Sequence, residues 1–178
     1  MTESPPHFTY YPDAIADGRV HRSDKVCAAC RRARGWISDA LLYSATKPDD
    51  AYFCPWCIAD GTAVRLFPGS FNELEDGDTD AEAARIVVER TPNFETWQDW
   101  SWPTHCGDVG VYLGQPSGTE LRANTKALDA LLADVAQYEW GRDADFMREF
   151  LNGLGGSQVV YLFECPCCGE QLVRWDLD

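Results

Sequence analysis

Apolar residues recur at helical spacing in two segments of the chain. In "DAEAARIVVER" the residues Ala84, Val87 and Val88 have this spacing, which predicts an amphipathic helix. The segment "GTELRANTKALDALLADVAQY" gives the clearest helical pattern, because one stripe is formed by Leu121, Leu128, Leu131, Leu132 and Val135. A shorter helix is expected through "DADFMREFLNGL".

Other segments have the patterns of strands, turns and extended chain. The C-terminal "GSQVVYLFECPCCGEQLVRWD" predicts two strands joined by a tight cysteine turn, and "WISDALLYS" predicts a strand or hairpin. Thr91 before Pro92 is typical of a helix N-cap and first position, so "TPNFETWQDW" is expected to begin a helical turn. The N-terminal "PPHFTYYPDAIADGRV" predicts an extended strap whose aromatic side chains cover an edge of the core. These are Phe8, Tyr10 and Tyr11.

Four cysteines form two C-x-x-C pairs in the first third of the chain. Cys27 and Cys30 make the first pair, and Cys54 and Cys57 in "CPWC" make the second. Alone, "CPWC" before a helix also suits a dithiol oxidoreductase, since a helix N-terminus lowers a thiol pKa. A redox dithiol needs only one such pair, whereas two pairs on either side of a hairpin match a tetrahedral zinc site. We therefore predict a structural zinc ion on these four thiolates, in a treble-clef arrangement.

A second, less regular set of metal ligands lies in the C-terminal half. Cys165 and Cys168 form a C-P-x-C-G knuckle between the two predicted strands, and "HCGD" offers His105 and Cys106. Three thiolates and an imidazole would complete a second zinc site, although adjacent ligands need a contorted backbone. Cys167 is a spare thiol. Alternatively, Cys106 and Cys167 are small buried apolar residues.

Taken together, these patterns predict an α+β protein stabilised by zinc. The expected parts are an N-terminal treble-clef or zinc-ribbon-like lobe, a helical segment, and a C-terminal zinc-ribbon-like hairpin. We place the first lobe, with its strap and an acidic linker, at residues 1–90 and the second at residues 91–178, the alternative being one compact domain. With 178 residues, 45% of them hydrophobic, the chain is long enough to bury a core.

The charge of the chain limits the classes of partner. A formal net charge of -14 disfavours nucleic acid and anionic membranes and favours a basic protein. The acids concentrate in "NELEDGDTDAEAAR", where the candidate partner-binding residues are Glu73, Glu75, Asp76 and Asp78; the alternative is a solvated loop and helix start. The N-terminus has no signal-peptide pattern and the apolar run "VVYLF" is too short to cross a bilayer, so we expect a cytoplasmic protein with reduced cysteines.

Support for catalysis is thin. His105, beside Cys106 and Asp108, is the one histidine with plausible partners, and a Cys-His nucleophile pair is conceivable there. Catalytic pairs are assembled by the fold rather than by adjacency in sequence, and Cys106 has a better role as a ligand. The tryptophans of "ETWQDWSWPTHC" could form a base-stacking platform, but in so acidic a chain they favour core or protein interface.

The motifs as a set resemble the CbrC family of bacterial proteins. The resemblance is carried by "CPWCIADG", "RTPNFETWQDWSWPTHCGD" and "YLFECPCCG", with the W-Q and W-x-x-H-C pattern in register at Trp97, Gln98, Trp102, His105 and Cys106. It implies a zinc-stabilised cytoplasmic protein associated with tolerance to a DNase-type colicin, and no catalytic residues. It also implies a further cysteine where this chain has Gly110, so that either His105, Cys167 or a water completes the second site, or the site is empty.

Two function classes follow from these observations. The first is an immunity or tolerance protein that binds and neutralises a basic, nuclease-type toxin. The second is a metal-dependent enzyme or regulator that uses the region of His105 and Asp108.

Overall fold

The computed structural model describes residues 3–98 and 100–177, and shows a mixture of short helices and strands. The helices are α1 (Pro55–Ala59), α2 (Thr62–Leu66), α3 (Ala81–Arg90), α4 (Gly118–Ala123), α5 (Thr125–Val135) and α6 (Ala144–Gly153), with a 3-10 turn η1 (Trp140–Arg142). The strands are β1 (Val20–Arg22), β2 (Trp36–Ser38), β3 (Glu73–Leu74), β4 (Ser101–Trp102), β5 (Thr104–His105), β6 (Asp108–Val109), β7 (Val111–Gly114), β8 (Gln158–Glu164) and β9 (Gln171–Leu177). The predicted α+β class is confirmed.

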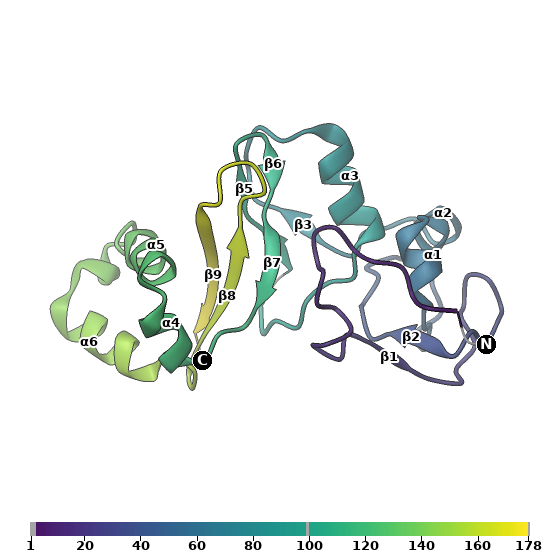
Figure 1. The fold of residues 1–178 in the computed structure, drawn as a ribbon, viewed down its shortest axis with the longest axis horizontal. Coiled ribbons are helices and arrows are strands. Elements are labelled where there is room, and N and C mark those ends of the chain that lie inside the picture. Colours follow the sequence, from purple (N-terminus) through teal and green to yellow (C-terminus); the bar gives the residue numbers. More distant parts are fainter. Residues whose placement is uncertain (1–2, 99, 178) are drawn as a thin grey trace.

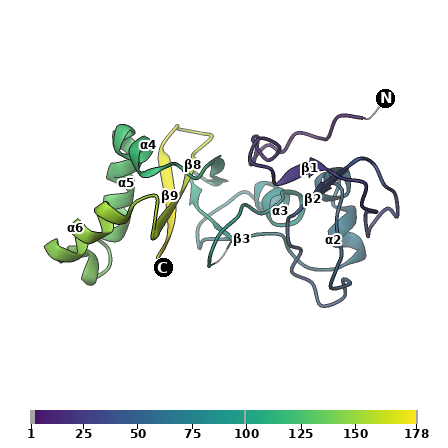
Figure 2. The same ribbon diagram turned by 90° about the horizontal axis from the view of Figure 1, so that it is seen from below.

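An antiparallel sheet with the strand order β7-β8-β9 lies in the middle of the molecule. Helices α4, α5 and α6 lie on one side of it, and the N-terminal elements lie on the other (Figures 1 and 2). Because side chains alternate along a strand, β8 contributes to two cores. Val159, Tyr161 and Phe163 belong to the larger core, whereas Val160 and Leu162 belong to the smaller core beneath the helices.

The larger core is rich in aromatic rings. Its residues come from both parts of the chain, before and after residue 90. The predicted burial of the strap is confirmed, since Phe8, Tyr10 and Tyr11 all lie in this core. Phe94 stacks on Tyr112 with ring centroids 4.7 Å apart. Edge contacts with further rings fix the cluster in one arrangement, and such pairs contribute beyond the area they bury.

Buried asparagine amides tie loops into this core. Asn93 is fully buried, and its Nδ2 donates to the carbonyl oxygens of Leu41 at 2.8 Å and Phe71 at 2.9 Å. Its Oδ1 accepts from the Leu41 backbone N–H at 3.2 Å and from the Arg19 guanidinium. One side chain therefore satisfies backbone groups of segments that have no regular structure of their own.

The expected helical turn at Thr91 and Pro92 is wrong. Residues 91–98 contain no helix, and Thr91 is instead the C-terminal cap of α3. Its Oγ1 donates to the carbonyl oxygen of Ile86 at 3.0 Å, and its own carbonyl accepts from Asn72. A Thr-Pro pair also suits a helix end, because Pro92 cannot continue the helix and restricts the residue before it to extended backbone.

The long predicted helix is two helices. Asn124 has φ -93° and ψ 89°, which ends α4, and its Oδ1 accepts from the Ala127 backbone N–H at 3.2 Å and so begins α5. The apolar stripe still faces the core on both sides of the break, with Leu121, Leu131 and Val135 buried. Asparagine competes with the helical backbone for hydrogen bonds, which explains why the stripe continues although the helix does not.

We expect Asn93→Ala to lower the free energy of unfolding by about 3 kcal/mol, because two buried carbonyl oxygens would lose their donor. Urea denaturation of the metal-loaded protein measures this. The exposed Asn152 of α6 is the matched control, and its alanine variant should stay within about 0.5 kcal/mol of the parent. A loss below about 1 kcal/mol at Asn93 would show that water replaces the amide.

Candidate metal centres

The first C-x-x-C pair lies in a tight knuckle between β1 and β2. The backbone N–H of Cys27 donates to the Arg32 carbonyl at 3.0 Å, and the N–H of Arg31 donates to the Cys27 carbonyl at 2.9 Å. Arg31 has φ 59°, in the left-handed region that non-glycine residues rarely occupy. This turn folds the chain back on itself at Cys27 and Cys30.

The second pair lies at the start of α1. Cys54 is the N-cap residue, Pro55 takes the first helical position, and the N–H of Cys57 donates to the Cys54 carbonyl at 3.0 Å. The N–H of Ala28 donates to the Tyr52 carbonyl at 2.8 Å, which attaches this segment to the knuckle. A knuckle followed by a returning chain and a cysteine-bearing helix start is the treble-clef order that the sequence predicts.

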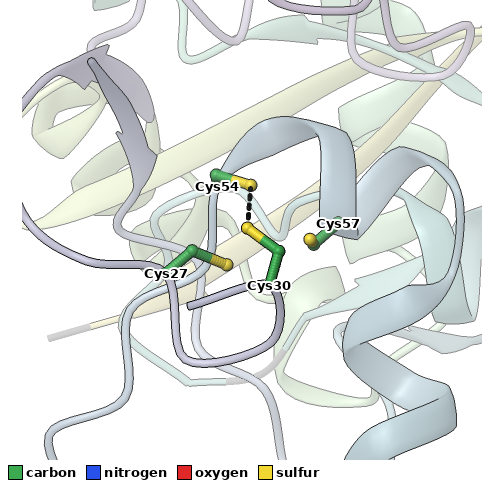
Figure 3. A group of neighbouring side chains, drawn as sticks. All are labelled: Cys27, Cys30, Cys54 and Cys57. Carbon is green, nitrogen blue, oxygen red and sulfur yellow. Dashed lines mark hydrogen bonds between the residues drawn. The ribbon is translucent and has the colours of Figure 1, made fainter. Parts of the chain in front are cut away.

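The four thiols of these segments point toward one another (Figure 3). Their sulfur atoms lie within 4.8 Å of one another, and the sulfurs of Cys30 and Cys54 are 3.8 Å apart. A tetrahedral ion with metal–sulfur bonds of about 2.3 Å holds its sulfurs about 3.8 Å apart, whereas a disulfide needs about 2.05 Å. Cys27, Cys54 and Cys57 are buried, so this cluster, the first centre, could hold a metal ion inside the core.

Hydrogen bonds between the thiols set their acidity. The thiols of Cys54 and Cys57 donate to Cys27 and hold its pKa far below the usual thiol value. The same contact with Cys27 raises the pKa of Cys54 to about 12. Only part of the cluster is thus ionised without a metal. Metal binding must release the remaining protons, so its affinity falls as the pH falls.

The second centre begins at the turn between β5 and β6. Thr104 pairs with Val109 and His105 with Asp108, which leaves Cys106 and Gly107 as a two-residue turn. Cys106 has φ 53° and Gly107 has φ 75°. Positive φ at both central residues is the geometry of a type I′ hairpin turn. This is the contorted backbone that adjacent ligands require, and it places the Cys106 sulfur 3.3 Å from Nδ1 of His105.

The turn between β8 and β9 completes the second centre. Its hydrogen bonds repeat those of the first knuckle: the N–H of Cys165 donates to the Glu170 carbonyl at 2.8 Å, and the N–H of Gly169 donates to the Cys165 carbonyl at 2.9 Å. The sulfur of Cys168 lies 3.8 Å from that of Cys106 and 3.4 Å from Nδ1 of His105. The structure thus brings together the four predicted ligands His105, Cys106, Cys165 and Cys168, and they could hold a second metal ion.

The two centres differ in exposure and in thiol acidity. In the second, Cys106 and Cys168 are exposed and only Cys165 is buried. Burial raises the pKa of Cys165, but contacts with His105 and with backbone N–H groups of the knuckle outweigh it and lower the pKa to about 6. The neighbouring Cys168 thiol raises the pKa of Cys106 to about 11.

The expectation that a residue at position 110 belongs to the second centre is not supported by the geometry. A Cβ on Gly110 would meet Phe163, Leu172 and Pro103 rather than the sulfur ligands. Cys167 is exposed and lies outside the ligand cluster. The cluster therefore has four ligands without Gly110, Cys167 or a water.

Asp108 has a positioning role beside the second centre. Its Oδ1 accepts a hydrogen bond from the hydroxyl of Tyr10 at 2.7 Å, which ties the N-terminal strap to the β5–β6 hairpin. Sequence reasoning missed this contact because 98 positions separate the two residues. It also missed the left-handed Arg31, although Gly169 at the same position of the second knuckle indicates what the turn requires.

The acidic segment is part of the fold rather than a free linker. Glu73 and Leu74 pair in parallel with β4, and Thr79 forms a parallel bridge with Gly107. Asp80 caps α3 through the N–H groups of its first turn. Glu75, one of the four candidate partner-binding acids, forms an ion pair with Arg174.

The remaining candidate partner-binding acids are Glu73, Asp76 and Asp78. They are exposed and form no ion pair within the described part of the chain. The tryptophans nearby divide between two environments: Trp102 is fully buried with its Nε1 donating to Asn72 at 2.9 Å, whereas Trp97 is 54% exposed.

Fold and site together define a class: a small α+β protein with two four-ligand candidate metal centres, one buried and one exposed. The sequence profile of the Uncharacterised protein family (UPF0167) matches residues 5–177, and the chain belongs to this family. UPF0167 protein Mb2317 of Mycobacterium bovis is 33% identical over 176 residues, which cover 96% of this chain and 92% of the relative. UPF0167 protein PA1536 of Pseudomonas aeruginosa is 32% identical over 179 residues, covering 97% and 96%. No solved structure matches the chain.

None of the helices in the described part of the chain has the length and apolarity needed to cross a bilayer.

We expect the two centres to release metal at different rates. A chelator reaches the exposed ligands of the second centre first, whereas the first centre opens only when the core does. A chromogenic chelator added to the metal-loaded protein should therefore report a fast and a slow phase of equal amplitude. Cys168→Ser should abolish the fast phase and keep the slow phase of the buried first centre.

Cys167→Ser is the matched control for this experiment, since Cys167 lies two residues from Cys165 but outside the ligand cluster. It should keep both phases. A single phase in the parent protein, or a fast phase that persists in Cys168→Ser, would contradict the assignment.

We expect Arg31→Gly to stabilise the protein by about 0.5–1 kcal/mol, because a left-handed L-residue costs about 1–2 kcal/mol and glycine returns part of that as chain entropy. Arg32→Gly is the control, since Arg32 is also exposed but has no positive φ. It should lose about 0.5–1 kcal/mol. Equal losses in both variants, measured by urea denaturation, would rule out strain at Arg31.

Proposed function

We propose that the protein is a zinc-stabilised binding protein of the bacterial cytoplasm that neutralises a basic nuclease toxin. The observation that carries this proposal is the acidic segment: Glu73, Asp76 and Asp78 are exposed, without ion pairs in the described part of the chain, and held on a paired backbone. The chain around them has a net charge of -14.

Zinc is the metal that suits both centres. Thiolate and imidazole ligands in tetrahedral sets favour zinc over the oxygen-seeking cations. The sulfur spacing of 3.8 Å in each cluster supports the same assignment. Three or four thiolates around a divalent ion leave the centre with a net negative charge. Zinc binding would therefore not reduce the negative charge of the protein.

A toxin that cleaves DNA is basic, because it must bind the phosphate backbone. An acidic partner gains fast association and charge complementarity against such a surface. Self-repulsion among the carboxylates destabilises the compact state, and neither zinc centre requires them. The resemblance to the CbrC family, with its association with colicin tolerance, supports the same class of partner.

The alternative, an enzyme or regulator at His105 and Asp108, has less support. Nδ1 of His105 lies among three thiols, so an ion there would have four protein ligands and no open position for a substrate. Asp108 already accepts the hydroxyl of Tyr10. We therefore assign both centres a structural role.

The test is direct binding between the zinc-loaded protein and the nuclease domain of a DNase-type colicin, followed by surface plasmon resonance at several salt concentrations. We expect association to slow steeply with added salt while dissociation changes less. Glu73→Gln, Asp76→Asn and Asp78→Asn together should weaken binding by about tenfold or more, mainly through the association rate. Bacteria that express the nuclease should lose protection in parallel.

The matched control carries Asp24→Asn, Asp49→Asn and Asp50→Asn, which remove the same charge at exposed positions outside the acidic segment. Cytochrome c, basic but not a nuclease, controls for nonspecific attraction. Equal weakening by both sets of substitutions, or equal affinity for cytochrome c, would show that net charge alone causes the binding. The acidic segment would then not be a specific binding site. Protection without contact, at catalytic amounts of protein, would favour the enzyme instead.

A further inference from the structure

Two adjoining cavities of about 350 and 220 Å³ have none of the candidate metal ligands in their linings. They form where three segments meet: residues 17–19 before β1, residue 95 after the buried Phe94, and residues 113–116 between β7 and α4. Asp17 and Gln115 line both cavities, so the two lie next to each other, and we call them together the Asp17 cleft. Clefts between packed units are the usual place for ligand sites.

The two ends of the Asp17 cleft differ in chemistry. One end has leucine walls at Leu113, Leu121 and Leu162, with the polar side chains of Glu120 and Asn124 beside them. The other end is charged, lined by Asp17, Glu95 and Arg19. The distribution is that of a site for a molecule with an aliphatic stem and a charged head.

The charged end favours a cation. Two carboxylates face one guanidinium there, and that guanidinium is already occupied: Nε of Arg19 donates to the Asn93 carbonyl at 2.6 Å, and Nη2 donates to the Asn93 side chain. Neither Asp17 nor Glu95 forms an ion pair closer than 4.0 Å within the described residues. Arg19 also interacts with Glu95 across the cavity, and the Tyr11 hydroxyl hydrogen-bonds to Asp17. Two carboxylates against one guanidinium still leave this end with a formal net negative charge.

A largely buried tyrosine also lines this end. Tyr112 lines the charged cavity with only 4% of its surface exposed, and among the described residues its hydroxyl has no hydrogen-bond partner. The ring is fixed by stacking on Phe94 at 4.7 Å and by an edge contact with Tyr11 at 4.8 Å. Burial raises the pKa of Tyr112, and the Asp17 carboxylate raises it further, so the hydroxyl stays neutral. The hydroxyl oxygen is therefore available to accept a hydrogen bond from a ligand in the cavity.

We propose that the Asp17 cleft binds an alkylammonium or alkylguanidinium group, with the cation held by Asp17, Glu95 and the hydroxyl of Tyr112 and the stem packed on Leu121 and Leu162. Lysine and arginine side chains have this shape, with an apolar stem and a cationic head. That the group comes from a side chain of the basic partner rests on the proposed function; a free small amine is the other source of the same chemistry.

The first test compares n-pentylamine with n-pentanol, which has the same stem but no charge, by two-dimensional NMR of the zinc-loaded protein. We expect the amine to shift the amide signals of Arg19, Leu113 and Leu121 and to bind about tenfold more tightly than the alcohol. Equal binding of alcohol and amine, or shifts confined to the acidic segment, would overturn the proposal.

Substitutions then test the three contacts. Asp17→Asn with Glu95→Gln should weaken n-pentylamine binding about tenfold, whereas Asp49→Asn with Asp50→Asn, which remove the same charge elsewhere, should not. Tyr112→Phe keeps the stacked ring and removes only the hydroxyl, and should weaken binding severalfold; Tyr138→Phe, at an exposed tyrosine, is its control. Unchanged binding in the Asp17 and Glu95 variant would refute the site.

The source of the cation is settled by two further ligands and the nuclease partner. If a capped lysine, N-acetyl-lysine methylamide, binds as n-pentylamine does and Asp17→Asn with Glu95→Gln weakens nuclease binding, the cleft takes a partner side chain. If cadaverine alone binds and nuclease affinity is unchanged, it is a free-amine site and the proposed function stands. If the protein binds n-pentylamine in the cleft but binds no nuclease, the proposal for the cleft stands and the proposed function is refuted.

Discussion

Convergence of four ligands on one point, at each of two places, is the constraint on which the rest of the structure depends. The elements that carry these ligands are too short to be stable alone: β1 and β2 pair over three residues, and β5 and β6 over two. An isolated two-stranded ribbon is marginal in water. Metal binding at these clusters would add free energy that only the folded arrangement gains, because the unfolded chain does not preform the site. Segments with little regular structure can therefore hold one conformation.

Between the two centres, β8 joins the parts of the molecule. Its two faces enter different cores, so the N-terminal elements and the helices α4 to α6 are both packed against the same strand. The aromatic cluster around Phe94 fills the face toward the first centre, and buried asparagines satisfy the loops that cross it. β8 pairs with β7 and β9 through backbone hydrogen bonds. Loss of packing on one face of β8 would therefore destabilise both cores.

The elements that the sequence predicts correctly are those with a local cause. Helix α3 follows from its apolar spacing, and the β8–β9 hairpin follows from an apolar run and a cysteine turn with its glycine. The pairing of His105 and Cys106 with a knuckle 60 positions later follows from ligand chemistry, which requires four donors. Failures occur where one local pattern permits two structures. A Thr-Pro pair such as Thr91-Pro92 can stand at the start or at the end of a helix. Asn124 can lie inside one long helix or cap the start of a new one, and asparagine favours the cap. Which one forms is decided by tertiary contacts such as that of Asn72 with Thr91.

The position of the acidic segment connects the second centre with the proposed function. Asp80 donates its N–H to the Gly107 carbonyl at 2.8 Å, and Thr79 bridges the same glycine, so the segment is attached to the turn that carries Cys106. That turn has positive φ at both central residues, a strained arrangement for Cys106 that metal ligation would stabilise. Order in the second centre is therefore transmitted through two backbone contacts to the carboxylates of Asp76 and Asp78. With metal bound, the exposed second centre would hold the proposed binding surface in shape, whereas the buried first centre would hold the core.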